Sequence, residues 1–142
     1  MATRSRIAQE QPDGTVKSIY CHWDGYPSNN GRILLEHYQD PQKVAALISL
    51  GALSYLSKEV APQEGQDHDF ESPASGVTVA YHRDRGEDYQ KPRENASVKS
   101  FFRSDIEEWG YLMTKEGEWL YQGGYKDKAV PTPLTVETYA ED

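Results

Sequence analysis

The densest group of chemically reactive side chains lies in one short run, Ser18 to Pro27, which reads SIYCHWDGYP. It holds a thiol, an imidazole, an indole, a carboxylate and two phenols. If residues 16–24 form a strand, its side chains alternate between two faces. One face would carry Ile19, Cys21 and Trp23, which we expect in the core. The other would carry a polar row of Tyr20, His22 and Asp24, with Tyr26 beyond the Gly25 turn.

A second group follows in Arg83, Asp84, Arg85 and Glu87. Arginines combined with aromatic rings are a common means of holding a nucleotide or a phosphate. If the strands at 16–24 and 76–82 were neighbours, this segment and the polar row could form one ligand or partner site. The alternative interpretation is an Arg–Asp network that only stabilises a turn at the end of the sheet.

Metal binding and nucleophilic catalysis are both disfavoured by residue placement. Cys21, His22 and His82 are suitable ligand types for a metal, but adjacent strand residues point to opposite faces. Cys21 would share its face with apolar residues, which predicts a buried structural thiol. The sequence has no G-x-S-x-G motif and no Walker-type loop. We therefore expect no metal and no cofactor, and we favour a role without catalysis while leaving enzymatic activity open.

Length, charge and cysteine count indicate which kind of protein this is and which kind of partner it could bind. The 142 residues suit a single domain spanning 1–142, and the formal charge of −8 disfavours direct binding of nucleic acid. An acidic surface suits a basic protein partner, such as one that holds nucleic acid. One cysteine excludes an intramolecular disulfide, and no apolar run has membrane-spanning length. These features predict a soluble protein of a reducing cytoplasm, with no membrane partner.

The pattern of apolar residues and turn signals predicts an α+β fold. We expect an antiparallel sheet of about four to five strands, built from two hairpins and a middle strand, with helices packed on one face. The expected strands are 4–9, 16–24, 76–82 and a hairpin over 108–122. The expected helices are 31–39 and 40–51, with one more apolar turn at 53–56.

The remaining segments are expected to be irregular. Residues 57–75 and 83–96 read as mobile loops, the first acidic and pinned by Phe70. Residues 97–104 fit either a helix or a strand. Residues 126–142 read as an extended tail in which Leu134 and Val136 dock on the body.

Six stretches of the sequence form a recognisable set: Met1–Ile7, Asp13–Val16, Ser18–Pro27, Gly31–Tyr38, Val77–Tyr81 and Arg83–Glu87. Together they resemble a family of small, functionally uncharacterised proteins of tailed bacteriophages and prophages. The resemblance spans most of the chain and implies a phage setting, hence the host cell cytoplasm, but no reaction.

In that setting we expect an accessory protein that binds a host protein, in concrete terms an inhibitor of a CRISPR or other nuclease-type defence complex. One alternative is a binder, or a hydrolase, of a nucleotide signal. Another is a minor virion or scaffolding protein.

Overall fold

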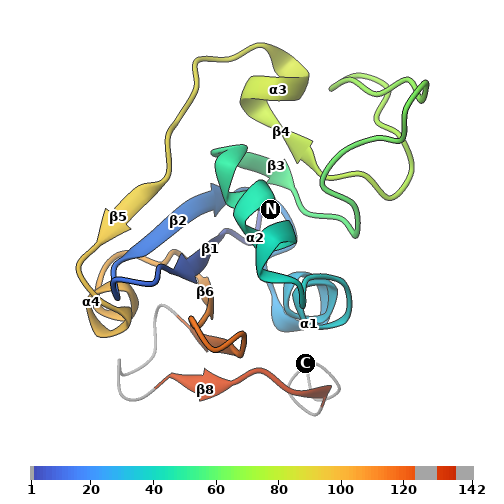
Figure 1. The fold of residues 1–142 in the computed structure, drawn as a ribbon. Coiled ribbons are helices and arrows are strands. Elements are labelled where there is room, and N and C mark those ends of the chain that lie inside the picture. The colour runs from blue at the N-terminus through green and yellow to red at the C-terminus, as the bar shows by residue number, and fades with distance from the viewer. Residues whose placement is uncertain (1, 124–130, 137–142) are drawn as a thin grey trace.

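The computed structural model describes residues 2–123 and 131–136. In this part of the chain, one mixed sheet of eight strands runs in the order β4-β3-β2-β1-β6-β7-β8, and β5 pairs with β2 beside that path (Figure 1). The strands are β1 (Ser5–Glu10), β2 (Val16–Cys21), β3 (Leu53–Tyr55), β4 (Val79–Ala80), β5 (Arg93–Asn95), β6 (Trp109–Met113), β7 (Trp119–Gly123) and β8 (Thr132–Pro133). The helices are a π-helical turn η1 (Pro27–Gly31), α1 (Arg32–His37), α2 (Pro41–Ser49), α3 (Tyr81–Arg85) and α4 (Val98–Arg103).

Both predicted hairpins are present. The first turn is fixed by Asp13, whose Oδ1 accepts a hydrogen bond from the Thr15 amide at 3.0 Å. In the second hairpin Tyr111 pairs with Tyr121. As its apolar residues on both faces predicted, β6 lies inside the sheet, between β1 and β7. Its two faces are covered because Tyr111 packs in the larger core cluster and Leu112 packs in the smaller one.

The sheet differs from the prediction in strand number and direction. It has more than the four to five strands expected, and it is mixed, because β1 pairs with β6 in parallel and β2 pairs with β3 in parallel. Parallel neighbours need a long crossover, and each of these two pairs is joined by chain that contains helices. The stretch at 53–56, predicted as a helical turn, begins with β3, where Leu53 O accepts a hydrogen bond from His22 N at 3.1 Å.

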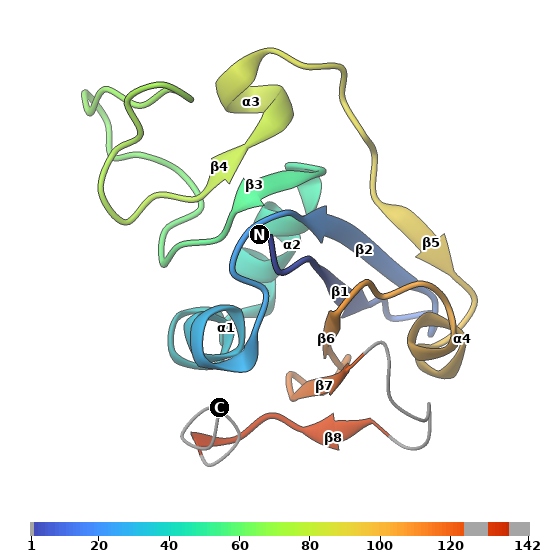
Figure 2. The ribbon, with the colours of Figure 1, turned by 180° about the vertical axis from the view of Figure 1, so that it is seen from behind.

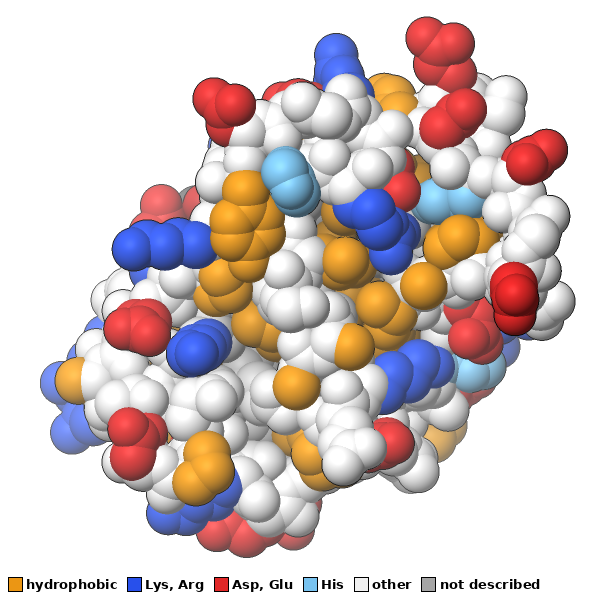
Figure 3. Space-filling view, turned by 45° about the horizontal axis from the view of Figure 1, so that its top comes forward, with side chains coloured by type: hydrophobic (Ala, Val, Ile, Leu, Met, Phe, Trp, Pro, Cys, Tyr) orange, Lys and Arg blue, Asp and Glu red, His pale blue; other side chains and the backbone are white. Residues whose placement is uncertain are grey.

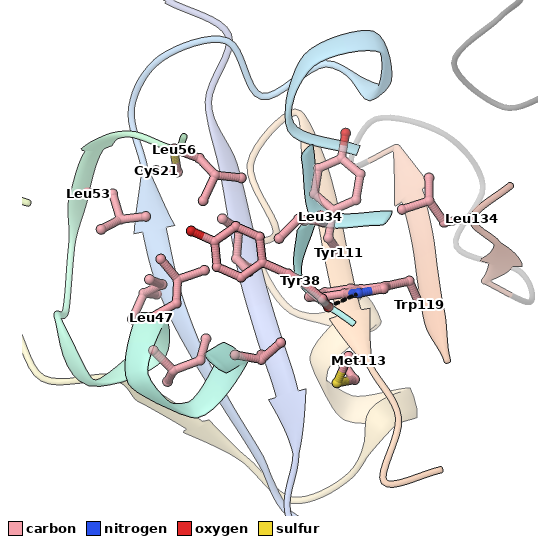
Figure 4. Close-up of a cluster of buried hydrophobic side chains, with 14 of the residues drawn as sticks. Cys21, Leu34, Tyr38, Leu47, Leu53, Leu56, Tyr111, Met113, Trp119 and Leu134 are labelled. Carbon is pink, nitrogen blue, oxygen red and sulfur yellow. Dashed lines mark hydrogen bonds between the residues drawn. The ribbon is translucent and has the colours of Figure 1, made fainter. Parts of the chain in front are cut away.

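Helices cover the two faces of the sheet. The predicted helices α1 and α2 pack on one face, where the larger core cluster lies (Figure 4). At its centre Trp119 Nε1 donates to the carbonyl oxygen of Tyr38 at 2.9 Å. Leu134 docks there as predicted, whereas Val136 is 59% exposed and does not. The opposite face carries α4, whose Phe101 and Phe102 are buried.

The middle of the chain is more regular than predicted. The strand expected at 76–82 contracts to β4, and the expected loop at 83–96 holds the end of α3 and all of β5. The short helix α3 ends at Gly86, whose φ of 78° is the left-handed conformation of a helix C-terminus. The ambiguous stretch 97–104 forms α4, and Ser97 caps it by accepting from Ser100 N at 3.0 Å.

The loop at 57–75 has few backbone pairings, as its turn residues predicted, but the structure gives it definite anchors. Glu59 bridges to Val77, and Phe70 N donates to Asp84 O at 3.0 Å. Phe70 therefore joins this loop to α3, the role the sequence suggested for it. Within the described residues, every helix is too short or too polar to cross a membrane. Most of the predicted tail at 126–142 lies outside the described residues.

Candidate functional site

An aromatic cluster, consisting of Tyr20, His22 and Trp23, lies at the end of β2. Trp23 was predicted to be a core residue, and this was wrong, because its side chain is 41% exposed. The strand ends at Cys21, two residues earlier than the alternation would need. Trp23 therefore lies beyond the regular strand, and the chain turns directly after it at Asp24, whose φ is 56°.

The aromatic cluster has internal contacts. The Tyr20 hydroxyl and His22 Nδ1 share a hydrogen bond of 2.7 Å, and the His22 and Trp23 rings meet edge to face with centroids 4.8 Å apart. Burial, and then the negative charge of Glu107, raise the pKa of Tyr20. Asp24 and Tyr26 are exposed beside this group. The polar row predicted from strand alternation is thus joined only between Tyr20 and His22.

The backbone beneath these rings is held tightly. Gly25 N donates to Thr3 O at 2.8 Å, and Gly25 O accepts from the buried Tyr111 hydroxyl at 2.7 Å. A Cβ atom at Gly25 would lie 2.7 Å from the Ser5 Cβ, so only glycine fits this close approach. The exposed Trp23 and Tyr26 rings therefore stand on a fixed turn.

Cys21 is fully buried, as the sequence predicted. Burial raises the pKa of its thiol to about 11, which leaves it protonated near neutral pH. Its nearest polar neighbours include Asn30 Nδ2 at 3.5 Å and the carbonyl oxygen of Trp23 at 3.7 Å. A protonated thiol with these partners supports the turn and is unsuited to nucleophilic attack.

The second predicted group forms the Arg83 network, made of Arg83, Asp84 and His68. Arg83 Nε donates to Asp84 Oδ1 at 2.8 Å. Its terminal nitrogens donate to the carbonyl oxygens of Val60 at 2.6 Å and Thr78 at 2.8 Å. Each guanidinium nitrogen is thus engaged within the protein. This geometry corresponds to the Arg–Asp turn network that was the alternative interpretation of the segment.

The carboxylate of Asp84 is the centre of this network, with a side chain only 3% exposed. Its Oδ2 also accepts from Ala80 N at 2.7 Å, which secures the first turn of α3. Burial by itself raises the pKa of Asp84, but the hydrogen bonds from Arg83 and Ala80 outweigh it and hold the pKa below its usual value.

His68 was missed by the sequence analysis. Its Nδ1 accepts from Ala74 N at 2.9 Å, so the neutral ring carries its proton on Nε2. That nitrogen lies 3.3 Å from Asp84 Oδ2, with the two side chains 2% and 3% exposed. The contact is close but poorly aligned for a hydrogen bond. A lone histidine in an acidic loop carries no spacing signal that could have placed it here.

Arg85 and Glu87 lie at the surface beside this network. Arg85 Nε is 3.3 Å from Glu87 Oε2, and the Arg85 guanidinium covers the Phe70 ring at 4.7 Å. An open pocket of about 440 Å³ lies here, lined by Asp69, Phe70, Glu71, Asp84 and Arg85. Figure 3 shows acidic side chains along this margin of the molecule, over the loop at 57–75.

The structure does not join the two predicted groups into one site. Strands β3 and β4 separate β2 from α3. Among residues 2–123 and 131–136, no hydrogen bond or ion pair links the aromatic cluster or Asp24 to Arg83, Asp84, Arg85 or Glu87. The same described residues contain no group of three or more histidine, cysteine or acidic side chains placed to hold a metal ion.

No protein-family model, no curated protein and no solved structure matches this chain.

Proposed function

We propose that this chain is a phage accessory protein that acts in the host cytoplasm by binding a host protein. The concrete form of the proposal is an inhibitor of a CRISPR or other nuclease-type defence complex. The observation that carries it is Trp23, a large aromatic side chain that is 41% exposed on a fixed turn. Tryptophan and tyrosine are enriched among the residues that dominate binding energy at protein interfaces. A fixed turn also lowers the entropy that is lost on binding.

Charge supports a basic partner. The chain has a formal charge of −8, and exposed acids Glu64, Asp67, Asp69 and Glu71 project from the loop at 57–75. Such a surface accelerates association with a positively charged protein. This acceleration becomes weaker as the salt concentration rises, because salt screens the attraction. A nuclease-type defence complex offers positive surfaces because it must hold nucleic acid.

Two alternative functions are a site for a nucleotide signal and a virion or scaffolding role. A site for a nucleotide signal that used Arg83 is disfavoured, because the charge of that guanidinium is already paired with the Asp84 carboxylate and its terminal nitrogens donate to main-chain oxygens. A virion or scaffolding role predicts that the chain is present in purified phage particles, and its absence from them would exclude that role.

The test begins with capture of the tagged chain from infected host cells, followed by calorimetry with the purified captured protein. We expect Trp23→Ala to lower the affinity by about 30-fold, the effect of losing a dominant interface residue. Tyr89→Ala is the matched control, because Tyr89 is 46% exposed but lies on the segment packed against Ser49 of α2. We expect it to leave the affinity unchanged.

The loop is tested separately by Glu64→Lys with Asp67→Lys. We expect slower association and a weaker dependence of the association rate on salt, with little change in dissociation. Equal affinities for Trp23→Ala and wild type, together with an unchanged association rate in the loop variant, would contradict the proposal.

A further inference from the structure

A different pair of arginines lies on the sheet face that carries α4. Arg6 is on β1, where it pairs with Tyr20, and Arg93 is on β5, where it pairs with Ser18. Ser18 also pairs with Ala8, which packs against α4. Because side chains two residues apart share a face, Arg6 and Arg93 flank β2 on the same side as Tyr20. Figure 2 shows β5 and α4 at one end of β2, with the connection from α4 to β6 crossing this face.

The hydrogen-bond partners of these two guanidinium groups are neutral. Arg6 donates to Ser18 Oγ at 3.1 Å and to Ser18 O at 3.2 Å. Arg93 donates to Asp105 O at 2.9 Å and to Ser104 Oγ at 2.7 Å. Arg93 Nε is buried and has no acceptor. All ion pairs within 4.0 Å in the described residues involve other cations, namely Arg4, Arg32, His68, Arg83 and Arg85.

The two charges also disfavour each other. Burial, and then the positive charge of Arg93, lower the pKa of Arg6 to about 10, and the negative charges of Glu107 and Asp105 offset this only in part. Burial likewise lowers the pKa of Arg93, and Asp105 and Glu107 offset this only in part. Those acids have other partners, since Glu107 pairs with Arg4 at 3.8 Å and Asp105 Oδ1 accepts from Glu107 N at 3.0 Å.

Partly buried charges are normally compensated by a close counter-charge. We propose that Arg6 and Arg93 form an anion site that takes a phosphate group of a small ligand. Guanidinium groups suit phosphate because their planar N–H donors match its oxygens. The phosphate could be free or belong to a nucleotide, whose base would find the rings of Tyr20 and His22 beside Arg6. The two arginines are not part of the proposed protein-binding surface, and the anion site does not depend on that proposed function.

The experiment is calorimetric titration of the full chain with inorganic phosphate, AMP and adenosine in a low-salt buffer free of phosphate. We expect phosphate and AMP to bind at one site and adenosine not to bind. AMP at least about tenfold tighter than phosphate indicates a nucleotide, and equal affinities indicate free phosphate; either result supports the anion site. Arg6→Met and Arg93→Met should each weaken binding by about tenfold or more, because a charge-assisted hydrogen bond is lost.

Arg85→Met is the matched control, since Arg85 is an exposed arginine paired with Glu87, and we expect it to bind as wild type does. A second readout needs no variant. In nuclear magnetic resonance spectra of the wild type, phosphate should shift the side-chain Nε–H signals of Arg6 and Arg93 and leave that of Arg83 in place. Absence of binding at millimolar phosphate and AMP, or shifts confined to other arginines, would overturn the proposal, and neither result bears on the Trp23 test.

Discussion

Two arginine groups in this protein have opposite surroundings. Arg83 donates to a buried carboxylate and to two main-chain carbonyl oxygens. Arg6 and Arg93 lie near each other on one sheet face and donate only to neutral oxygens. The comparison shows that an Arg–Asp motif in a sequence can be a structural clamp. Two arginines far apart in the sequence, whose side chains donate only to neutral oxygens, are the better candidates for ligand binding.

The largest effect expected from this comparison is the loss of stability in Asp84→Asn. The change removes the negative charge beside Arg83 and leaves a guanidinium whose charge is no longer compensated. Breaking a buried pair in this way typically costs about 3–5 kcal/mol of unfolding free energy. Urea denaturation followed by tryptophan fluorescence measures it. Glu87→Gln, which breaks the exposed pair with Arg85, is the control and should cost less than about 1 kcal/mol. Equal losses in the two variants would show that the Arg83 network is not a clamp.

The next effect is a dependence of stability on pH. The pKa of Asp84 is held below its usual value near 3.8 in the folded chain. The unfolded chain therefore takes up the proton first as pH falls, so the stability due to this carboxylate is present above about pH 3.8 and is lost as pH drops through the folded pKa. Urea midpoints of wild type and Asp84→Asn, measured from pH 6 to pH 3, should converge toward low pH. A difference between the two urea midpoints that stays constant over this pH range would contradict the lowered pKa of Asp84.

Local patterns predicted those elements that neighbouring residues determine. Asp13 and Gly14 defined the first turn, and Asp40 and Pro41 defined the start of α2, where Asp40 Oδ1 accepts from Gln42 N at 2.9 Å. Helix α3 was missed, because its first turn depends on the Asp84 side chain folding back to Ala80 N. The parallel pairing of β1 with β6 joins strands far apart in the sequence, and no local pattern encodes that choice.

The candidate site was also predicted only in part, because local sequence patterns do not encode where strands end or which distant strands pair. Tyr20 and His22 share a face and a hydrogen bond, as alternation implied. Trp23 was misplaced because β2 ends at Cys21, and neither Cys21 nor His22 is a turn residue that would signal the end of the strand. Arg93 was assigned to a loop, and its proximity to Arg6 exists only once β5 pairs with β2.

The smallest expected effect sharpens the comparison most, and it concerns Arg6→Met. The variant loses two hydrogen bonds to Ser18, each worth about 1 kcal/mol, but it also removes a partly buried charge that disfavours Arg93. These effects oppose each other, so in phosphate-free buffer we expect the unfolding free energy to change by no more than about 1 kcal/mol. Phosphate should then raise the melting temperature of the wild type and not that of Arg6→Met, because a ligand stabilises only the state that binds it. A loss in Arg6→Met as large as that in Asp84→Asn, with no response of the wild type to phosphate, would mean that Arg6 is a structural residue like Arg83, and the distinction between the two arginine groups would fail.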